Sequence, residues 1–172
     1  MMALYVLVAA ALAGLDQLVK YLVRTYMTLG ESRPFIPYIC QLTYVQNTGA
    51  AFSSMEGMRW FFVIVTVIVL IIALWALAAG KISGAFGRWA LVVTMGGAVG
   101  NLIDRALYGY VVDMFDVLFM NFAVFNVADI FVVCGGIAFC VYLFFSPDLD
   151  GKKTPAPETE DGEAGENGKD GD

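Results

Sequence analysis

The residues best suited to chemistry in this chain are aspartates in one of its most apolar stretches. Residues 111–130, VVDMFDVLFMNFAVFNVADI, carry Asp113, Asp116 and Asp129. Asp113 and Asp129 have no cation beside them in the sequence, and two carboxyl groups that lie close together share a proton. The ionised member can take a proton from water while the protonated member donates to a carbonyl oxygen, which is the acid–base pair that peptide hydrolysis needs. The same pair would also suit a proton or ion pathway.

Other polar residues recur at helical spacing, so that each pair can share one face of a helix. The pairs are Asp16 with Lys20, Asn101 with Arg105, and Asn126 with Asp129. The simplest interpretation of Asp16 and Lys20 is a structural salt bridge near the membrane interface. Asp104 is also interpreted as structural, and Asp116 as a solvated residue of a polar loop.

The composition excludes several kinds of catalytic and metal site. Histidine is absent, which removes Ser-His and Cys-His arrangements, HExxH zinc sites and histidine proton relays. The three cysteines, Cys40, Cys134 and Cys140, are odd in number and form no CxxC motif, so neither a disulfide framework nor a zinc site is indicated. We predict no metal, no organic cofactor and no nucleic-acid partner.

The elements that must position these side chains are membrane-spanning helices. Hydrophobic residues make up 59% of the 172 residues and charged residues only 15%, against about 25% charged in soluble domains. Apolar runs at residues 3–23, 60–79, 89–107 and 122–145 are long enough to cross a bilayer. We predict an all-α integral membrane protein with four transmembrane helices and a small extracytoplasmic loop region that contains β-structure, at residues 41–46, QLTYVQ.

The chain divides into a membrane domain, residues 1–146, and an acidic tail, residues 147–172, that is predicted to be disordered. More than half of the 16 acidic residues lie in this tail, so the net charge of −6 reports the tail and not a basic partner. Residues 80–88 are predicted to form a short basic turn, and residues 108–121 a second connecting loop. Both termini should lie on one side of the membrane, but the basic residues divide evenly and leave the side undecided.

The polar ends of the first, third and fourth spans should lie at the same face of the membrane, because successive spans alternate in direction. Ionisable groups inside a bilayer are expensive and usually functional, so this polar cluster is a candidate site. Gly96, Gly97 and Gly100 include a G-x-x-x-G spacing, which favours close helix packing over phosphate binding.

Five short motifs follow one another over these spans. They are DQLVK (16–20), NTGAAFS (47–53), GGAVGNLIDR (96–105), VVD (111–113) and FNVAD (125–129). In this order and in these topological places they closely resemble bacterial lipoprotein signal peptidase, signal peptidase II. The resemblance covers residues 10–145, and none of the five motifs departs from the family's pattern.

The resemblance implies an aspartyl endopeptidase that removes the signal peptide from prolipoproteins whose lipobox cysteine already carries diacylglycerol. It implies that Asp113 and Asp129 are the catalytic pair. The residues implied to line the site and hold substrate or inhibitor are Asn47, Asn101, Arg105 and Asn126, with Asp16 and Lys20 in a supporting role. No metal or cofactor is implied.

The resemblance also implies a location and two kinds of ligand. The protein would be a multi-pass protein of the bacterial inner membrane, with cytoplasmic termini and an active site near the outer leaflet. The diacylglyceryl chains of the substrate would lie among the membrane lipids, and the loop at residues 24–59 could close over the bound peptide. Globomycin, a cyclic peptide that inhibits the family, would be a ligand.

The residues alone leave other classes of protein open. A small ion- or proton-coupled membrane protein would use Asp113 and Asp129 to carry charge, and would show ion flux without peptide cleavage. A scaffold subunit would use the glycine face of the third span and would not depend on either carboxylate. A presenilin-like intramembrane aspartyl protease is disfavoured, because the chain lacks a G-x-G-D motif and that fold needs more than four spans.

Overall fold

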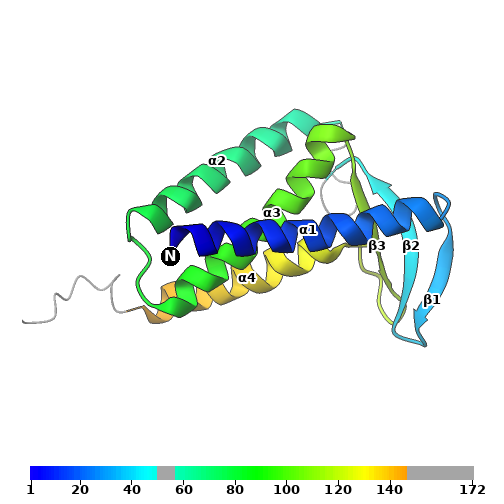
Figure 1. Ribbon diagram of the computed structural model, residues 1–172. Helices are drawn as coiled ribbons and strands as arrows, with labels where there is room; N and C mark the ends of the chain where they lie inside the picture. Colours follow the sequence, from blue (N-terminus) through cyan, green and yellow to red (C-terminus); the bar gives the residue numbers. More distant parts are fainter. Residues whose placement is uncertain (50–56, 147–172) are drawn as a thin grey trace, which may run out of the picture.

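A computed structural model describes residues 1–49 and 57–146, and Figure 1 shows helices side by side with a small sheet at one end of them. The helices are α1 (Met2–Tyr26), α2 (Arg59–Ala78), α3 (Ala85–Leu107) and α4 (Val127–Phe145). The strands are β1 (Ser32–Ile36), β2 (Cys40–Asn47) and β3 (Val111–Val117). The acidic tail lies outside the described residues, so its disorder stays a prediction.

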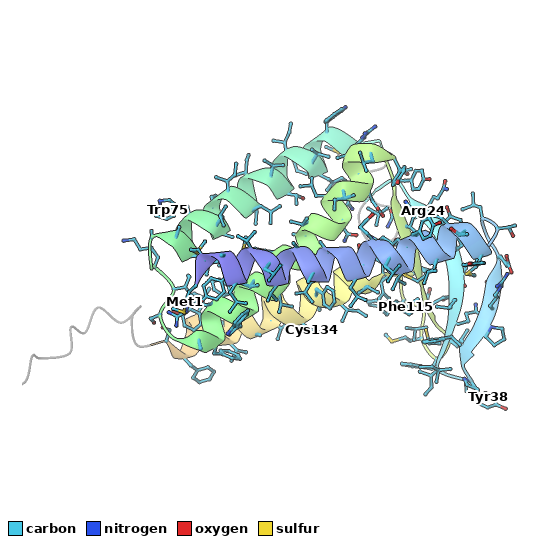
Figure 2. All side chains as sticks on the ribbon, in the orientation of Figure 1. Met1, Arg24, Tyr38, Trp75, Phe115 and Cys134 are labelled. Atoms are coloured by element: carbon cyan, nitrogen blue, oxygen red, sulfur yellow. The ribbon has the colours of Figure 1, made fainter. Side chains whose placement is uncertain are left out.

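All four helices are long and apolar enough to cross a membrane, which confirms the predicted fold class. Large apolar side chains cover their outer faces, and Trp75 of α2, for example, is 60% exposed. Figure 2 shows these side chains projecting from the helices. Water would penalise so large an apolar surface, whereas lipid accommodates it, and each helix satisfies its own backbone hydrogen bonds as a bilayer requires.

The fourth span begins at Val127 and not at residue 122 as predicted. Asn126 has an extended backbone, and its side chain accepts a hydrogen bond from the Asp129 backbone N–H while the Asp129 carboxylate accepts from the Asn126 N–H. This reciprocal capping box starts the helix at the next residue. Phe125, just before it, is bridged to Phe115 in an antiparallel pair, which keeps the preceding segment out of the helix.

The three strands form an antiparallel sheet in the order β1-β2-β3. The predicted strand at residues 41–46 lies within β2. The interpretation of residues 108–121 as a connecting loop was wrong for β3. Here the backbone pairs with β2 on one side, and the Met114 and Phe115 N–H groups donate to the Phe125 carbonyl on the other. The partners of this strand lie far away in the sequence, so its own short pattern did not reveal it.

The pairing of β2 with β3 contains an irregularity close to Asp113. Leu42 pairs with Phe115 and Val45 with Asp113, so β2 has one more residue than β3 between these pairs. Such a bulge bends the strand and increases its twist. It therefore contributes to the direction in which β3 presents the Asp113 side chain.

The sheet is fixed to the bundle by a small apolar core at the end of α1. Its buried members are Val23 of α1, Met27 just after α1, Tyr44 of β2, and Val112 and Met114 of β3. Val112 and Met114 are fully buried and flank Asp113 in the sequence. Since alternate strand residues face opposite sides, burying these two side chains against α1 turns Asp113 to the other face of β3.

The glycines of α3 and α4 allow the helices to pack closely. A Cβ atom on Gly97 would overlap the carbonyl oxygen of Ala128 in α4, and one on Gly96 would lie 2.8 Å from the Leu12 side chain of α1. A Cβ on Gly100 would lie 2.6 Å from the carboxylate of Asp16. The interpretation of this glycine pattern as a packing face is confirmed.

Two neighbouring glycines of α4 provide a matched test of this packing. A Cβ on Gly135 would lie 2.8 Å from the backbone nitrogen of Thr94 in α3, whereas one on Gly136 would meet nothing within 4 Å. We expect Gly135→Ala to lower the free energy of unfolding by about 1–3 kcal/mol through overpacking. Gly136→Ala should raise it by up to about 1 kcal/mol through helix propensity. Thermal unfolding in detergent measures both, and equal effects would contradict close α3–α4 packing at Gly135.

Candidate active site

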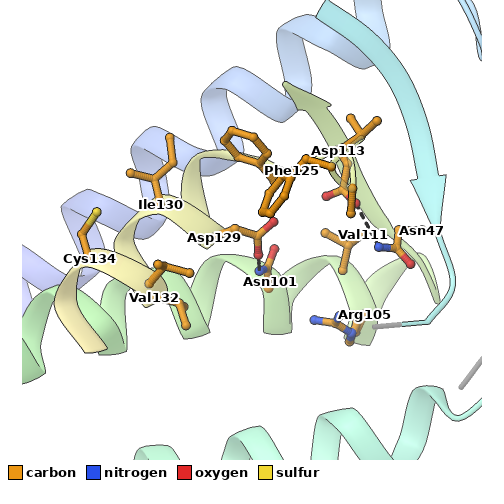
Figure 3. A pocket seen from close by; sticks show the side chains of 14 residues that line it. Asn47, Asn101, Arg105, Val111, Asp113, Phe125, Asp129, Ile130, Val132 and Cys134 are labelled. Atoms are coloured by element: carbon orange, nitrogen blue, oxygen red, sulfur yellow. Dashed lines mark hydrogen bonds between the residues drawn. The ribbon is translucent and has the colours of Figure 1, made fainter. Parts of the chain in front are cut away.

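A cavity of about 620 Å³ lies where the end of β2, the last turns of α3, β3 and the start of α4 come together. Its polar lining consists of Asn47, Asn101, Arg105, Asp113 and Asp129. The rest of the lining is apolar and comes from residues 122–125, Val111 and the first turns of α4. Figure 3 shows both carboxylates at this cavity, Asp113 from β3 and Asp129 from α4.

Asp113 is almost completely buried, with 2% of the residue exposed. Its carboxylate accepts hydrogen bonds from Asn47 Nδ2 at 3.0 Å and from Asn126 Nδ2 at 2.6 Å. Burial, followed by the negative charge of Asp129, raises the pKa of the Asp113 carboxyl to about 6, although the two amides and Lys20 oppose this rise. Asp113 therefore keeps its proton to a higher pH than an ordinary aspartate does.

Asp129 occupies the first turn of α4, where the free N–H groups of a helix favour negative charge. One carboxylate oxygen accepts from Asn101 Nδ2 at 2.7 Å, and the other accepts from the Asn126 backbone N–H at 3.1 Å. The surroundings of the two aspartates therefore differ. Asp129 is held at a helix terminus, whereas Asp113 is held in a buried strand.

Asn126 connects the two aspartates. Its Nδ2 group donates to Asp113 at 2.6 Å and to Asn101 Oδ1 at 3.1 Å, while its Oδ1 atom accepts from the Asp129 N–H at 2.9 Å. Because a backbone N–H occupies the oxygen, the orientation of the amide is determined and its two hydrogens must point at their acceptors. The predicted site residues Asp113, Asp129, Asn101 and Asn126 therefore form one hydrogen-bonded unit.

The other two predicted site residues lie at the same cavity. Asn47 uses Nδ2 for Asp113 and Oδ1 for the Gly49 N–H, at 3.0 Å each. Arg105 places its guanidinium 5.1 Å from the centre of the Phe62 ring and donates to the Gly49 carbonyl at 3.2 Å. Residues 50–53 of the NTGAAFS motif, and with them part of the loop predicted to close over a peptide, lie outside the described residues.

Asp16 and Lys20 lie behind this unit and do not line the cavity. The predicted salt bridge is present at 2.8 Å, and both side chains are fully buried within the protein. Lys20 also contacts Asp104 at 3.2 Å and donates to Asn101 Oδ1 at 2.8 Å. Gln17, which the sequence gave no reason to single out, donates to Asp104 at 2.9 Å. Its position beside Asp16 in the DQLVK motif was the only available signal.

Asp116 lies in β3 and not in a polar loop, which corrects the interpretation from the sequence. Its carboxylate accepts hydrogen bonds from Gln41 Nε2 at 2.8 Å and Thr43 Oγ1 at 3.0 Å of the neighbouring strand. It does not line the cavity.

In residues 1–49 and 57–146, no group of three His, Cys, Asp or Glu side chains could hold a metal ion. The absence of a metal and of a cofactor stays a prediction.

This arrangement is chemically suited to acid–base catalysis on a substrate from the lipid phase. Two carboxyl groups with different surroundings lie at the polar end of an apolar cavity, and neutral amides, not cations, make their closest side-chain contacts. One carboxyl can therefore stay protonated while the other is ionised. Ile130, Val133 and Cys134 line the cavity and are also exposed on α4, so the apolar end adjoins the surface that lipid covers.

The chain is similar in sequence to proteins named lipoprotein signal peptidase. The family model of signal peptidase (SPase) II matches residues 8–145. The chain is 43% identical to the lipoprotein signal peptidase of Streptococcus pyogenes serotype M2 (strain MGAS10270) over 145 residues, which cover 84% of this chain and 95% of that one. It is 42% identical, with the same coverage, to the lipoprotein signal peptidase of Streptococcus pyogenes serotype M5 (strain Manfredo).

Two solved structures, each described as a bacterial membrane enzyme, have the same fold. The first, at 2.3 Å resolution, matches with a TM-score of 0.80 and 31% sequence identity over 90% of this chain and 94% of that chain. The second, at 1.9 Å resolution, matches with a TM-score of 0.76 and 33% identity over 84% of this chain and 94% of that chain.

The raised pKa of Asp113, about 6 against an ordinary 3.8, makes the folded protein bind this proton more tightly than the unfolded chain does. The free energy of unfolding should therefore fall as the pH rises from about 4 through about 6. Lowering the pH from about 7.5 to about 5 should raise it by roughly 1–2 kcal/mol. The chain has no histidine to obscure this window. Thermal unfolding in detergent measures the effect, and an equal pH dependence in Asp113→Asn would contradict it.

Proposed function

Because this chain belongs to the signal peptidase II family, we propose that it hydrolyses the peptide bond before the diacylglyceryl-modified cysteine of a prolipoprotein, with Asp113 and Asp129 as the acid–base pair. Family membership makes the chain a membrane protease that acts in the removal of lipoprotein signal peptides. The observation that supports the aspartic mechanism is the bridge made by Asn126, which ties the two carboxyl groups together at the polar end of the cavity.

The two carboxyl groups take different parts in the proposed mechanism. Asp129, at the helix N-terminus, accepts a proton from water as the water oxygen attacks the peptide carbonyl carbon. Asp113, the buried and protonated member, donates a hydrogen bond and then its proton to the carbonyl oxygen, so that the tetrahedral intermediate carries no isolated charge.

Two further proton transfers accompany the collapse of the tetrahedral intermediate. The carbon–nitrogen bond breaks, the leaving amine of the lipid-modified cysteine takes the proton from Asp129, and Asp113 recovers its proton from one of the two hydroxyl groups of the intermediate, whose oxygen becomes the carbonyl oxygen of the new carboxylic acid. Atoms and charge balance without a metal or cofactor. Because each carboxyl group ends in its starting state, the same pair can begin the next turnover.

Asn47 and Arg105 are suited to bind the substrate backbone. Both line the same cavity as Asp113 and the apolar segment at residues 122–125. An amide and a guanidinium can hold peptide carbonyl groups in a fixed position, and such positioning supplies much of the acceleration in a hydrolysis. Asn101 and Asn126 hold the pair in place through their hydrogen bonds to Asp129 and Asp113, and Asn101 also lines the cavity.

The proposed location follows from the family and from the shape of the site. The protein would lie in the bacterial inner membrane with cytoplasmic termini and the sheet at the outer leaflet. Ile130, Val133 and Cys134 form a wall that is open to lipid, so the diacylglyceryl chains can remain in the membrane while the peptide bond reaches the carboxyl groups. This accounts for carboxylates in so apolar a stretch.

Replacement of either aspartate of the pair should abolish cleavage. In Asp113→Asn and Asp129→Asn, loss of one proton-transferring group should lower kcat by about 10²- to 10⁴-fold or more. Asp116→Asn is the matched control, since it makes the same change in the same strand but outside the cavity. The assay is the gel shift of a diacylglyceryl-modified prolipoprotein in detergent.

Two outcomes of this assay would contradict the proposal. A folded wild-type protein that cleaves no prolipoprotein but moves ions across vesicle membranes would favour the ion-coupled class. Loss of activity in Asp116→Asn with full activity in Asp113→Asn would show that the carboxylate is wrongly assigned.

Globomycin should inhibit the wild-type protein by occupying the same cavity. We expect it to compete with the prolipoprotein, raising the apparent KM and leaving kcat unchanged at saturating substrate. Initial rates at several inhibitor concentrations measure this. Undiminished cleavage at saturating globomycin would count against the proposed site.

A further inference from the structure

Behind the pair of aspartates lies a cluster of buried charges that the proposed mechanism does not use. Asp16, Lys20 and Asp104 are each 0% exposed. The Lys20 ammonium group has three hydrogens and three acceptors within reach, at 2.8 Å on Asp16, 3.2 Å on Asp104 and 2.8 Å on Asn101. One lysine of α1 is thereby bonded to its own helix and, at two places, to α3.

Each carboxylate of this cluster also holds a backbone N–H group. Asp16 Oδ1 accepts from the Ala128 N–H at 2.8 Å, and Ala128 immediately precedes Asp129. Asp104 Oδ2 accepts from the Val112 N–H at 3.0 Å, and Val112 immediately precedes Asp113. The two anions of the cluster are therefore attached to the main chain one residue before each member of the catalytic pair.

Gln17 joins the two halves of the cluster. Its Nε2 group donates to Asp104 Oδ1 at 2.9 Å and to the Gly100 carbonyl at 3.0 Å, and it lies 3.4 Å from Asp16 Oδ2. Lys20 and Gln17 thus both connect the two carboxylates. Each carboxylate thus has two kinds of partner. One is a side chain of α1, and the other is a backbone N–H group next to Asp113 or Asp129.

The cost of burying such charges makes stability a poor explanation for the cluster. Well-packed apolar residues in place of a buried ion pair often leave a protein equally stable or more stable. Apolar residues could not bind the N–H groups of Val112 and Ala128, which are buried and need acceptors. The cluster therefore fixes the distance between the backbone N–H groups of Val112 and Ala128.

We propose that Asp104 and Gln17, together with Asp16 and Lys20, form a buried clamp that sets the separation of the two catalytic carboxyl groups. Asp104 and Gln17 are positioning residues in this clamp and do not touch substrate. Asp104 holds β3 beside Asp113, Asp16 holds α4 beside Asp129, and Lys20 with Gln17 holds the two anions together. The clamp rests on the proposed function, because its role is defined by the reaction of the pair.

Loosening the clamp should affect the chemistry more than the binding of substrate. Asp104→Ala removes the acceptor of the Val112 N–H, so that β3 can shift relative to α4. We expect kcat to fall about 10- to 100-fold, as misplacement by an ångström can produce, with KM changed by less than about twofold because Asn47 and Arg105 are untouched. Asp104→Asn keeps an acceptor for Val112 and should restore part of kcat. Gln17→Met should lower kcat in the same direction but less.

The pH profile distinguishes a positioning role from general stabilisation. The two limbs of the profile report the two proton dissociations of the pair. Carboxylates that move apart repel each other less, so the limbs should lie closer together in Asp104→Ala and in Gln17→Met. The other charged side chain of the cavity, Arg105, is unchanged in these variants.

Val92→Ala is the matched control for a loss of stability alone. Val92 is 1% exposed and packs with Tyr5, Ala9 and Leu77, away from the clamp. It should lower thermal stability while kcat and the separation of the limbs stay at the wild-type values. If the Asp104 and Gln17 variants behave as Val92→Ala does, the clamp proposal is wrong.

A second measurement separates failure of the clamp from failure of the proposed function. The carboxyl resonances of protein labelled with ¹³C at its aspartates follow the two titrations without any substrate. If the limbs of the pH–rate profile and the titrations of the carboxyl resonances shift together in the variants, the result supports the clamp. Carboxyl titrations of the pair that are identical in wild type, Asp104→Ala and Gln17→Met would overturn the clamp even if the wild type cleaves prolipoprotein. A wild type that cleaves nothing would overturn the proposed function alone.

Discussion

Asn126 caps a helix, follows directly on a strand pairing and bonds to both members of the pair of aspartates, and the geometry of the site depends on this. Its oxygen caps α4, and its nitrogen donates to Asp113. The residue before it, Phe125, pairs with Phe115 two positions beyond Asp113. The start of the helix therefore cannot move along β3 without breaking hydrogen bonds that are buried and costly to leave unmade. The register of β3, the first residue of α4 and the spacing of the two carboxyl groups therefore cannot change independently of one another.

The polar groups of the protein lie in layers, each with a different charge. The carboxyl groups of Asp113 and Asp129 face the cavity, the neutral amides of Asn101 and Asn126 bond to them, and Lys20 lies behind the amides and donates to Asn101. If Lys20 contacted either of these two carboxylates directly, its charge would favour the ionised form of that group and prevent the pair from sharing a proton. The amides connect the ion cluster to the pair without placing a cation in contact with it.

Much of the fold could be predicted from the sequence because it depends on local properties. Length and apolarity identify four spans, and the spacing of Gly96, Gly97 and Gly100 identifies a packing face. The site residues were predicted from family motifs, and the structure brings Asp113, Asp129, Asn101 and Asn126 into one hydrogen-bonded unit. What was missed depends on partners distant in the sequence. β3 exists because of β2 and Phe125, and Gln17 reaches an acceptor 87 residues away.

The hydrogen bond from the Ala128 N–H to Asp16 joins residues 112 positions apart in the sequence, so it can form only late in synthesis. At about 5–20 residues per second, roughly ten seconds separate the appearance of α1 from that of α4. Throughout that interval Asp16 lacks its backbone partner, and only Lys20, four residues along the same helix, can neutralise it inside the membrane. The ion pair thus acts twice. It first offsets the charge of Asp16 within one helix, and it later binds the Ala128 N–H of the last helix, so that the hydrogen-bonded unit is assembled only when the chain has been made through α4.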